Sequence, residues 1–336
     1  MKHVRITRAF CATGAILLSA AAPALASNYD QMVVFGDSLS DNGNLATAAG
    51  PGVFSALDYD PARATDGPTT TPASSISGVT VEQLNSLLGL SPLTPSIAGG
   101  TNYAWGEATT ASNPPDLVHG ITPGTGFQEF SYIVQNSHAD PNSLYVIWAG
   151  SNDLLNATTT AGIQAAETQA LINLEDQVGT LLSLGAKHIA WFDLPDLSLT
   201  PAGKLEGAAL DQQLHDSSLQ FRTDWTTTIS EFQTLFPSAS ITGIDTYTFM
   251  QEIVANPAKY GLTDVTDPAQ GQVGVNPDQY LFWDAEHPTT AVDSLLAEDA
   301  YRQLVPVPEP SGSVYLGGAL VLVVLQRLYV LRRRAA

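Results

Sequence analysis

The sequence predicts an α/β fold, in which mainly parallel β-strands pack between helices. Short apolar runs rich in β-branched and aromatic residues recur along the chain, and each is typical of a buried strand. Between them lie longer segments whose apolar residues recur at helical spacing, so strands and helices alternate. No composition break or internal repeat divides residues 27–305, so we expect a single domain built as an α/β/α sandwich.

The predicted elements follow in chain order. The first strand spans Tyr29 to Phe35, and the turn at Gly36-Asp37-Ser38 ends it. The second strand spans Ser143 to Trp148 and is apolar almost throughout. The remaining predicted elements are a helix from about residue 171 to Gly185, a strand from Lys187 to Phe192, a helix from about Leu205 to Phe232, a strand from Ala239 to Ile244, a helix through Ile253 and a helix from Thr290 to Leu304.

Two stretches rich in glycine, proline, serine and threonine separate these elements. Residues 46–78 are predicted to form a long surface loop, and residues 109–126 form a second such stretch with three prolines. Long loops in compact domains usually have a function. We therefore expect the first stretch to border a substrate cleft.

Composition excludes several classes of function. The 336 residues include 33 acidic and 13 basic side chains, for a formal net charge of −20. Seven basic residues lie near the two ends, so the stretch between them carries about −27 and would repel a nucleic acid. With 44% hydrophobic residues the chain can bury a core rather than remain disordered. Because Cys11 is the only cysteine, we expect no disulfide framework and no cysteine-based metal site.

The N-terminal segment has the layout of a secretory signal peptide. Three basic residues, Lys2, Arg5 and Arg8, precede an apolar run that ends in Ala24-Leu25-Ala26. We expect cleavage after Ala26, which would remove residues 1–26. No twin-arginine pair is present, and this favours export through the Sec machinery. An uncleaved N-terminal anchor is the alternative.

The C-terminal segment, residues 306–336, combines three features. Val307-Pro308-Glu309-Pro310 comes first, an apolar run from Val314 to Leu331 follows, and Arg332-Arg333-Arg334 comes after it. This layout resembles the PEP-CTERM sorting signal of Gram-negative bacteria, which an exosortase recognises and cleaves. The resemblance implies transient membrane contact and a location in the cell envelope or at the surface, or release after processing. Arg327 departs from the pattern because it interrupts the apolar run, and an ordinary C-terminal membrane anchor is the alternative.

Polar residues gather where the predicted strands end. Gly36-Asp37-Ser38-Leu39 follows the first strand, and Gly150-Ser151-Asn152-Asp153 follows the second. A third group, Trp283 to Thr289, comes shortly before the last helix. In a parallel α/β sheet, reactive groups collect at the carboxyl ends of the strands. We therefore expect these three groups to lie close together.

Three of these residues fit the chemistry of acyl transfer. A serine hydroxyl becomes a nucleophile when a base takes its proton, and a carboxylate fixes the tautomer of that base. Ser38 is the candidate nucleophile. The three-residue spacing of Asp284 and His287 lets the carboxylate reach the histidine Nδ1 and leaves Nε2 to face the serine. The candidate oxyanion donors are the backbone N–H groups of Ser38 and Gly106 and the side-chain amide of Asn152.

Each motif alone also has an ordinary structural interpretation. Gly-Asp-Ser after a strand is a common turn, Asp284 could cap a helix beside a solvated His287, and Asn152 could cap the helix that follows it. The occurrence of all three motifs together favours a catalytic site. Histidines do not cluster at metal-ligand spacing, so neither a metal nor another cofactor is expected, while a structural calcium stays open. The other histidines of the exported stretch are interpreted as surface or core residues: His119, His138, His188 and His215.

Four blocks of the chain resemble the GDSL (SGNH) hydrolase family, and the similarity spans about residues 32–304. The resemblance implies a flavodoxin-like α/β/α sandwich with a mainly parallel sheet. The blocks are Phe35 to Asn44 (FGDSLSDNGN), Asn102 to Gly106 (NYAWG), Gly150 to Asp153 (GSND) and Asp284 to Thr289 (DAEHPT).

The resemblance also assigns roles to single residues. It implies that Ser38 is the nucleophile and that His287 is the base, oriented by Asp284. Gly106 and Asn152 would complete the oxyanion hole with the Ser38 N–H. The second block departs from the family's pattern, because Glu107 stands where a glycine is common. A carboxylate there would disfavour an oxyanion, so we expect it to point to solvent.

The sequence therefore predicts an exported carboxylic-ester hydrolase, an esterase or lipase, that works through an acyl-enzyme. The substrate stays open between small esters, lipids and glycans, and an acetylesterase or an acyltransferase on envelope glycans or lipids is an alternative. A non-catalytic envelope module that retains the fold is a further one. The acidity of the middle of the chain makes an anionic bilayer unfavourable, so small soluble esters or acetylated glycans are preferred over membrane phospholipid.

Overall fold

The computed structural model describes residues 29–70, 76–116, 120, 122–205 and 207–305. The predicted signal peptide and the predicted sorting segment, residues 306–336, lie outside these ranges. Within them, every helix is too short or too polar to cross a bilayer.

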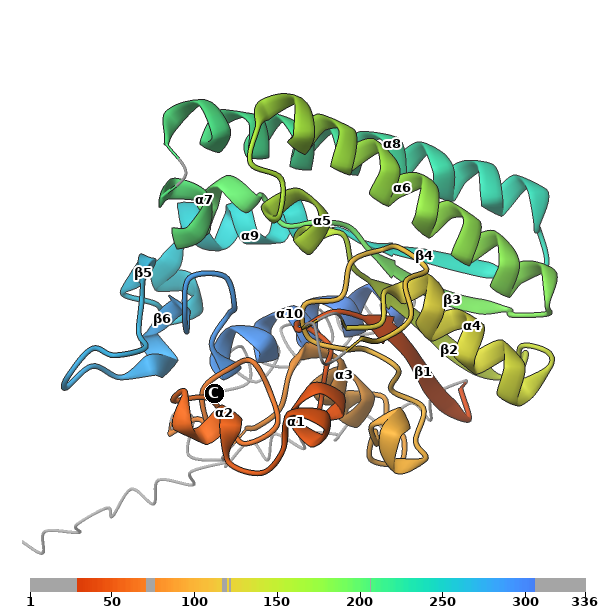
Figure 1. The fold of residues 1–336 in the computed structure, drawn as a ribbon, viewed down its shortest axis with the longest axis horizontal. Helices are drawn as coiled ribbons and strands as arrows, with labels where there is room; N and C mark the ends of the chain where they lie inside the picture. The colour runs from red at the N-terminus through yellow and green to blue at the C-terminus, as the bar shows by residue number, and fades with distance from the viewer. Residues whose placement is uncertain (1–28, 71–75, 117–119, 121, 206, 306–336) are drawn as a thin grey trace, which may run out of the picture.

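A parallel four-stranded sheet forms the centre of the fold (Figure 1). Its strands are β1 (Gln31–Gly36), β2 (Ser143–Trp148), β3 (His188–Phe192) and β4 (Ser240–Ile244), and they lie side by side in chain order. All three strand pairs are parallel, and β1 and β2 pair residue for residue from Gln31 opposite Ser143. The predicted strands are confirmed, with ends that differ by at most two residues.

An extended segment, residues 101–105, continues the sheet beyond β1. The Val34 N–H donates to the Thr101 carbonyl at 3.0 Å, and the Tyr103 N–H donates back to the Val34 carbonyl at 2.8 Å. A third bond, from the Trp105 N–H to the Gly36 carbonyl, is 3.1 Å long. Because this segment runs parallel to β1, it brings Gly106 to the same sheet edge as Ser38.

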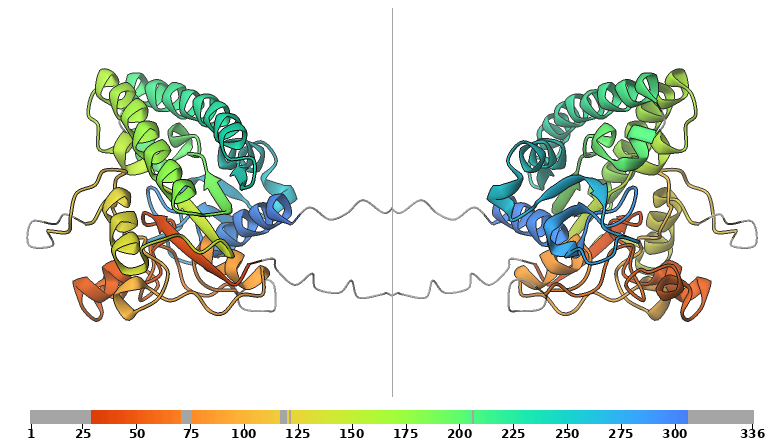
Figure 2. Two further views of the ribbon diagram at one scale, coloured as in Figure 1. Left: turned by 90° about the vertical axis from the view of Figure 1, so that its right-hand side faces the viewer. Right: turned by 90° about the vertical axis from the view of Figure 1, so that its left-hand side faces the viewer.

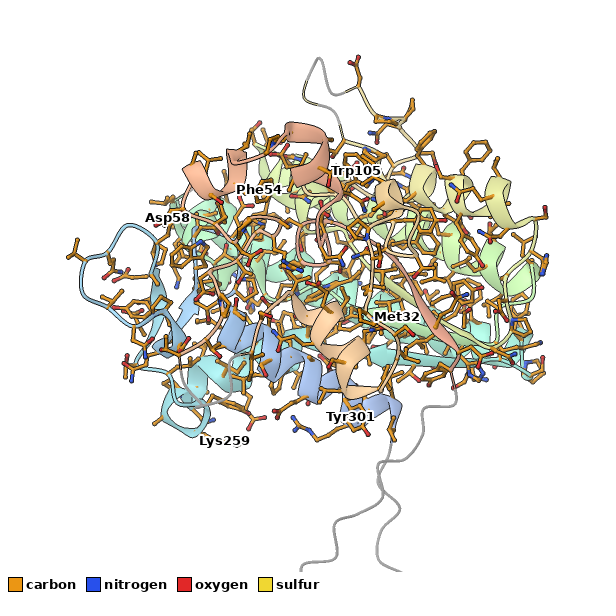
Figure 3. The ribbon with its side chains drawn as sticks, turned by 90° about the horizontal axis from the view of Figure 1, so that it is seen from below. Met32, Phe54, Asp58, Trp105, Lys259 and Tyr301 are labelled. Carbon is orange, nitrogen blue, oxygen red and sulfur yellow. The ribbon has the colours of Figure 1, made fainter. Side chains whose placement is uncertain are left out.

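Helices cover both faces of the sheet. One layer contains α4 (Thr125–Asn136) and the long pair α6 (Thr160–Ser183) and α8 (Ala208–Leu235), which pack against each other (Figure 2). The opposite layer contains α3 (Thr80–Leu87), α9 (Thr246–Ala255) and α10 (Thr290–Leu304). Figure 3 looks onto this second layer, where α3 and α10 lie side by side. The predicted α/β/α sandwich is therefore confirmed.

Each strand feeds both layers of the core. Along β2, Tyr145 and Ile147 belong to the cluster beneath α6 and α8, whereas Leu144 and Val146 belong to the cluster beneath α3, α9 and α10. All four side chains are fully buried. Successive side chains of a strand point to opposite faces, so a strand covered on both faces is apolar throughout. This explains why the strands appear in the sequence as unbroken apolar runs.

Shorter elements connect these layers at the carboxyl edge of the sheet. The helices are α1 (Asn44–Ala49), α2 (Val53–Ala56), α5 (Ser151–Leu155) and α7 (Pro201–Leu205), the 3₁₀ turns are Ser96–Ala98, Leu197–Leu199, Pro257–Tyr260 and Pro277–Gln279, and a small parallel pair consists of β5 (Asp264–Pro268) and β6 (Tyr280–Phe282).

The structure differs from the prediction in the loop regions. The stretch predicted as a loop, residues 46–78, contains α2 and most of α1, and α4 begins inside the second predicted loop. Helix α6 begins at Thr160, eleven residues before the first leucine of the predicted pattern, because the Thr159 hydroxyl accepts from the Gly162 N–H and caps it there. After the turn that follows β1, the next helix is α1, which begins at Asn44.

Candidate active site

Ser38 lies in a tight turn at the carboxyl end of β1. The Asp37 carbonyl accepts from the N–H groups of Ser40 and Asp41, at 3.1 and 2.9 Å, and closes the turn. A Cβ on Gly36 would lie 2.7 Å from the Trp148 carbonyl oxygen, so only glycine lets β1 approach β2 so closely here. The turn leaves the Ser38 side chain partly exposed.

His287 and Asp284 reach Ser38 from the loop between β6 and α10. His287 Nε2 lies 2.7 Å from Ser38 Oγ, and His287 Nδ1 lies 2.7 Å from Asp284 Oδ2. The other carboxylate oxygen, Asp284 Oδ1, accepts from the backbone N–H groups of Glu286 and His287, each at 2.7 Å. These backbone hydrogen bonds hold the Asp284 carboxylate in place independently of the His287 side chain, and such bonds are common for aspartates at loop turns. We call Ser38, His287 and Asp284 the Ser-His-Asp chain.

The electrostatics of this chain favour a charged aspartate beside a basic histidine. Burial alone would raise the pKa of Asp284, but hydrogen bonds from His287 and Tyr59 outweigh it and lower the pKa to about 2. Burial alone would lower the pKa of His287, but the Asp284 carboxylate outweighs it and raises the pKa. Asp284 therefore stays ionised at neutral pH and increases the basicity of Nε2.

Tyr59 is a neighbour of Asp284 that the sequence did not reveal. Its hydroxyl donates to Asp284 Oδ2 at 2.6 Å, the same oxygen that contacts His287 Nδ1. Burial and the adjacent carboxylate raise the pKa of Tyr59, so it remains a donor at neutral pH. The residue belongs to the long stretch predicted as a loop and is separated from Asp284 by 225 positions.

The predicted oxyanion donors differ in their availability. Asn152 stands in α5, where Gly150 (φ 120°) turns the chain out of β2. Its side-chain amide donates to the Ala108 carbonyl at 3.0 Å, and one amide hydrogen remains. The Gly106 N–H, by contrast, donates to Asp41 Oδ2 at 2.8 Å. The Gly106 N–H therefore has an acceptor in this structure, and its role in the oxyanion hole stays a prediction.

The residue after Gly106 is in an unusual conformation. Glu107 has a φ of 63°, which non-glycine residues seldom adopt. Its side chain is exposed, in agreement with the expectation that it faces solvent. Among the hydrogen bonds of the described residues, its backbone N–H has no acceptor. A second backbone donor is thus available one residue beyond the predicted one.

Asp41 explains why Gly106 is engaged. Asp41 Oδ1 accepts from the N–H groups of Gly43 and Asn44, and Oδ2 accepts from those of Leu45 and Gly106. The carboxylate therefore caps the start of α1 and ties residues 101–106 to the turn that carries Ser38. The polar residues after Ser38 in FGDSLSDNGN thus build the site.

A groove opens in front of the Ser-His-Asp chain. It has a volume of about 580 Å³ and is bordered by the 49–64 stretch, including Val53, Phe54 and Leu57. The prediction that this stretch borders a cleft is confirmed. A second, smaller cavity also reaches Ser38, from the side of α9 and α10.

The other histidines and carboxylates considered as candidates do not join the Ser-His-Asp chain. In the described ranges, no three His, Cys, Asp or Glu side chains come together in a way that could hold a metal. His215, which is predicted to be a surface or core residue, pairs with the buried Asp196 at 2.7 Å. Among the described residues, no serine hydroxyl contacts His215 as Ser38 contacts His287, and the Ser198 hydroxyl donates to the Asp196 carboxylate itself.

The fold and the site define a class. A serine, a histidine and a carboxylate joined by hydrogen bonds at the carboxyl edge of a parallel sheet have the geometry that serine hydrolases use for acyl transfer. Residues 32–300 match the GDSL-like lipase/acylhydrolase family, and the chain belongs to this family.

Known proteins resemble the chain over most of its length. The esterase EstA of Pseudomonas aeruginosa is 31% identical over 330 residues, which cover 85% of this chain and 48% of EstA. A GDSL esterase/lipase of Arabidopsis thaliana is 26% identical over 328 residues, covering 80% of this chain and 86% of that protein. A solved G-D-S-L family protein from Veillonella parvula has 15% identity and a TM-score of 0.45, covering 82% of this chain and 99% of that one. The chain spans about half the length of the Pseudomonas relatives it matches.

Proposed function

We propose that the protein hydrolyses carboxylic esters through an acyl-enzyme on Ser38. The observation that carries this proposal is the Ser-His-Asp chain, whose two contacts are both 2.7 Å long in a member of the GDSL family. Serine needs such a base to react, because its hydroxyl is otherwise a weak nucleophile.

In the first half of the reaction, His287 Nε2 takes the hydroxyl proton as Ser38 Oγ bonds to the ester carbonyl carbon. The carbonyl π electrons move to oxygen and form a tetrahedral oxyanion. The imidazolium then gives its proton to the leaving alkoxide as the carbon–oxygen bond breaks, which releases the alcohol. Asp284 holds the tautomer and stabilises the imidazolium.

In the second half, water attacks the acyl-enzyme. His287 takes a proton from the water, and a second tetrahedral oxyanion forms. Its collapse breaks the bond to Ser38 Oγ, to which His287 returns the proton, and it releases the carboxylic acid. The enzyme ends in its starting state.

For the oxyanion, we propose the Ser38 N–H and the Asn152 amide as donors, joined by the Glu107 N–H. The Gly106 donor predicted from the sequence is replaced, because its N–H is already bonded to Asp41. Glu107 is supported by its left-handed backbone and its place in the wall of the groove. Donors fixed before the reaction need no reorganisation when charge develops.

We also propose the predicted division of the chain: residues 1–26 as a signal peptide, 27–305 as the hydrolase domain, and 306–336 as an exosortase-type sorting signal. Sequence patterns support this division, and the two end segments lie outside the described residues. The mass of the protein recovered from the envelope and the medium of a producing cell tests it. Intact N- and C-terminal segments in every fraction would contradict it.

The test of the activity is hydrolysis of p-nitrophenyl butyrate by the wild-type protein and by Ser38→Ala. We expect turnover by the wild type and only background release by the variant. Equal rates would refute a serine mechanism. Absence of turnover by both, together with absence of labelling by a fluorophosphonate, would favour the non-catalytic module.

A further inference from the structure

Two cavities of different character meet at the Ser-His-Asp chain. Ser38, Asn152 and His287 line both of them, so both reach the place where an ester carbonyl would react. An ester has two parts, an acyl chain and an alcohol, and they extend from the reacting carbonyl in different directions. If Ser38 reacts as proposed, one cavity receives the acyl chain and the other receives the alcohol.

The smaller cavity has an apolar wall. It extends between β2, α9 and α10, and most of its exposed surface is carbon. The apolar walls are contributed by Trp148, Leu155, Leu197, Met250, Phe282 and Leu296. Such a wall favours hydrocarbon over a hydroxylated alcohol, because apolar contact removes hydrocarbon from water whereas a buried hydroxyl without a partner is costly.

Several polar groups of the smaller cavity are already engaged, whereas Asp37 Oδ2 and Ser151 Oγ are buried without a hydrogen-bond partner among the described residues. Asp196 is 2% exposed, and its carboxylate accepts from His215, Gln251 and Ser198. Thr246 donates through its hydroxyl to Asp193. Apart from these two oxygens, the wall of the cavity offers a substrate mainly carbon surface.

The volume of this cavity limits the length of the acyl chain. It measures about 50 Å³. One water-sized group needs about 10–15 Å³ of such space, so the cavity holds about three to five non-hydrogen atoms. An acetyl to butyryl group fits this space, whereas an octanoyl group does not.

The groove on the other side is larger and acidic. Its volume of about 580 Å³ is more than ten times that of the small cavity. Four carboxylates line it, those of Asp41, Glu107, Asp284 and Glu286, and no lysine or arginine of the described residues does. The nearby Arg63 binds Glu82 and Asp60 instead. Glu107 and Glu286 are both exposed.

We infer that the substrate is an ester of a short acyl chain, of about two to four carbons, with a bulky alcohol that carries no negative charge. The acyl chain occupies the small cavity, and the alcohol occupies the groove. Anionic alcohols are repelled by the exposed carboxylates. Acylated polyols and esters of cationic alcohols meet both requirements, whereas long-chain anionic phospholipids meet neither.

The acyl half is tested with p-nitrophenyl acetate, butyrate, octanoate and palmitate. We expect kcat/KM for octanoate to be at least about tenfold below that for butyrate, since each methylene that a filled pocket rejects has a cost of this order. Leu155 lines the cavity and is only partly buried, so Leu155→Ala should raise the octanoate-to-butyrate ratio about tenfold. Leu184→Ala is the matched control, because Leu184 is equally half-buried on the same core cluster and lies away from both cavities.

The alcohol half is tested with three aryl acetates: phenyl acetate, 3-acetoxybenzoate and 3-acetoxy-N,N,N-trimethylanilinium. The measured quantity is kcat/KM for the cationic ester divided by kcat/KM for the anionic ester. We expect this ratio to fall about tenfold in the Glu107→Gln/Glu286→Gln double variant. In the wild type we expect it to fall as the salt concentration rises. Because the same ratio is compared between the wild type and the variant, the intrinsic reactivity of each leaving group cancels. The Glu231→Gln/Glu298→Gln double variant removes the same charge at exposed sites elsewhere and should leave the ratio unchanged.

Each outcome decides a separate point. A preference for octanoate or palmitate in the wild type, or no change in chain preference in Leu155→Ala, overturns the assignment of the small cavity. An unchanged cation-to-anion ratio in Glu107→Gln/Glu286→Gln overturns the assignment of the groove. Failure on every ester, with no fluorophosphonate labelling, refutes the proposed function itself and is therefore distinct from both.

Discussion

Replacing Tyr59 by phenylalanine tests whether the hydroxyl beside Asp284 tunes the base. The hydroxyl and His287 Nδ1 contact the same carboxylate oxygen, at 2.6 and 2.7 Å. Phenylalanine keeps the ring, which packs 6.0 Å from Phe54 between ring centres, and removes only the donor. Without that donor, more of the Asp284 charge acts on His287.

The size of the effect follows from the bond that is lost. A hydrogen bond to a charged group contributes about 1.5–3 kcal/mol. Because the His287 contact and two backbone donors continue to hold Asp284, we expect a change in the Asp284–imidazolium interaction at the lower end of this range. About 1.4 kcal/mol moves the pKa of His287 up by about one pH unit, so kcat/KM on the acid limb falls about tenfold, whereas the plateau at high pH stays unchanged.

The pH dependence gives the sign of the effect. His287 acts as a base only when it is unprotonated, so activity appears as pH rises through its pKa. Removing the Tyr59 donor strengthens the attraction of Asp284 for the imidazolium and raises the pKa of His287 further. We expect the acid limb of the kcat/KM profile for p-nitrophenyl butyrate to move to higher pH in Tyr59→Phe.

A matched substitution provides the control. Tyr103 is buried, and its hydroxyl donates to Gln135 at 3.0 Å, far from the site in the hydrogen-bond network. Tyr103→Phe should leave the acid limb in place. If Tyr59→Phe shows the wild-type profile, or the same profile as Tyr103→Phe, then Tyr59 has only a structural role.

Two further predictions concern the oxyanion and the stability of the fold. Asn152→Ala should lower kcat by about 100- to 1,000-fold, because one oxyanion donor typically contributes about 2.7–4 kcal/mol. Steady-state kinetics with p-nitrophenyl butyrate measures this change. A fall in kcat of less than about threefold would show that Asn152 is not an oxyanion donor. Burial raises the pKa of Glu129 to about 8, and its Oε1 has no partner, so the stability that its protonated form provides is lost as pH rises toward and through that value. Urea unfolding at pH about 5 and about 9 should show a smaller loss of stability in Glu129→Gln than in the wild type, and parallel curves would contradict the burial argument.

Most of the central sheet could be predicted because its strands are buried on both faces. Ser143 to Trp148 is apolar apart from its first residue, and the structure gives this strand the predicted ends. Residues 101–105 were not predicted to join the sheet, because Asn102 interrupts any apolar pattern. Their pairing depends on Asn102 and Asn44, whose side-chain amides bond to backbone carbonyls of the neighbouring segments. Such long-range polar contacts leave no periodic signal.

The site shows the same division between local and distant information. Asp284 and His287 are three residues apart, so their contact could be predicted from local geometry. Tyr59 and Asp41 could not be placed in this way, because each acts on a partner far along the chain. The choice of Gly106 as a donor followed the family's motif, and the motif does not show that Asp41 already occupies its N–H.

The central claim is that His287 and Asp284 activate Ser38. The most direct measurement is the rate and position of labelling by a fluorophosphonate, followed by intact mass and by peptide sequencing. We predict one adduct on the wild-type protein, located at Ser38, no adduct on Ser38→Ala, and labelling slowed by at least about a hundredfold in His287→Gln. An adduct on a different residue, or equal labelling rates for the wild type and His287→Gln, would contradict the claim.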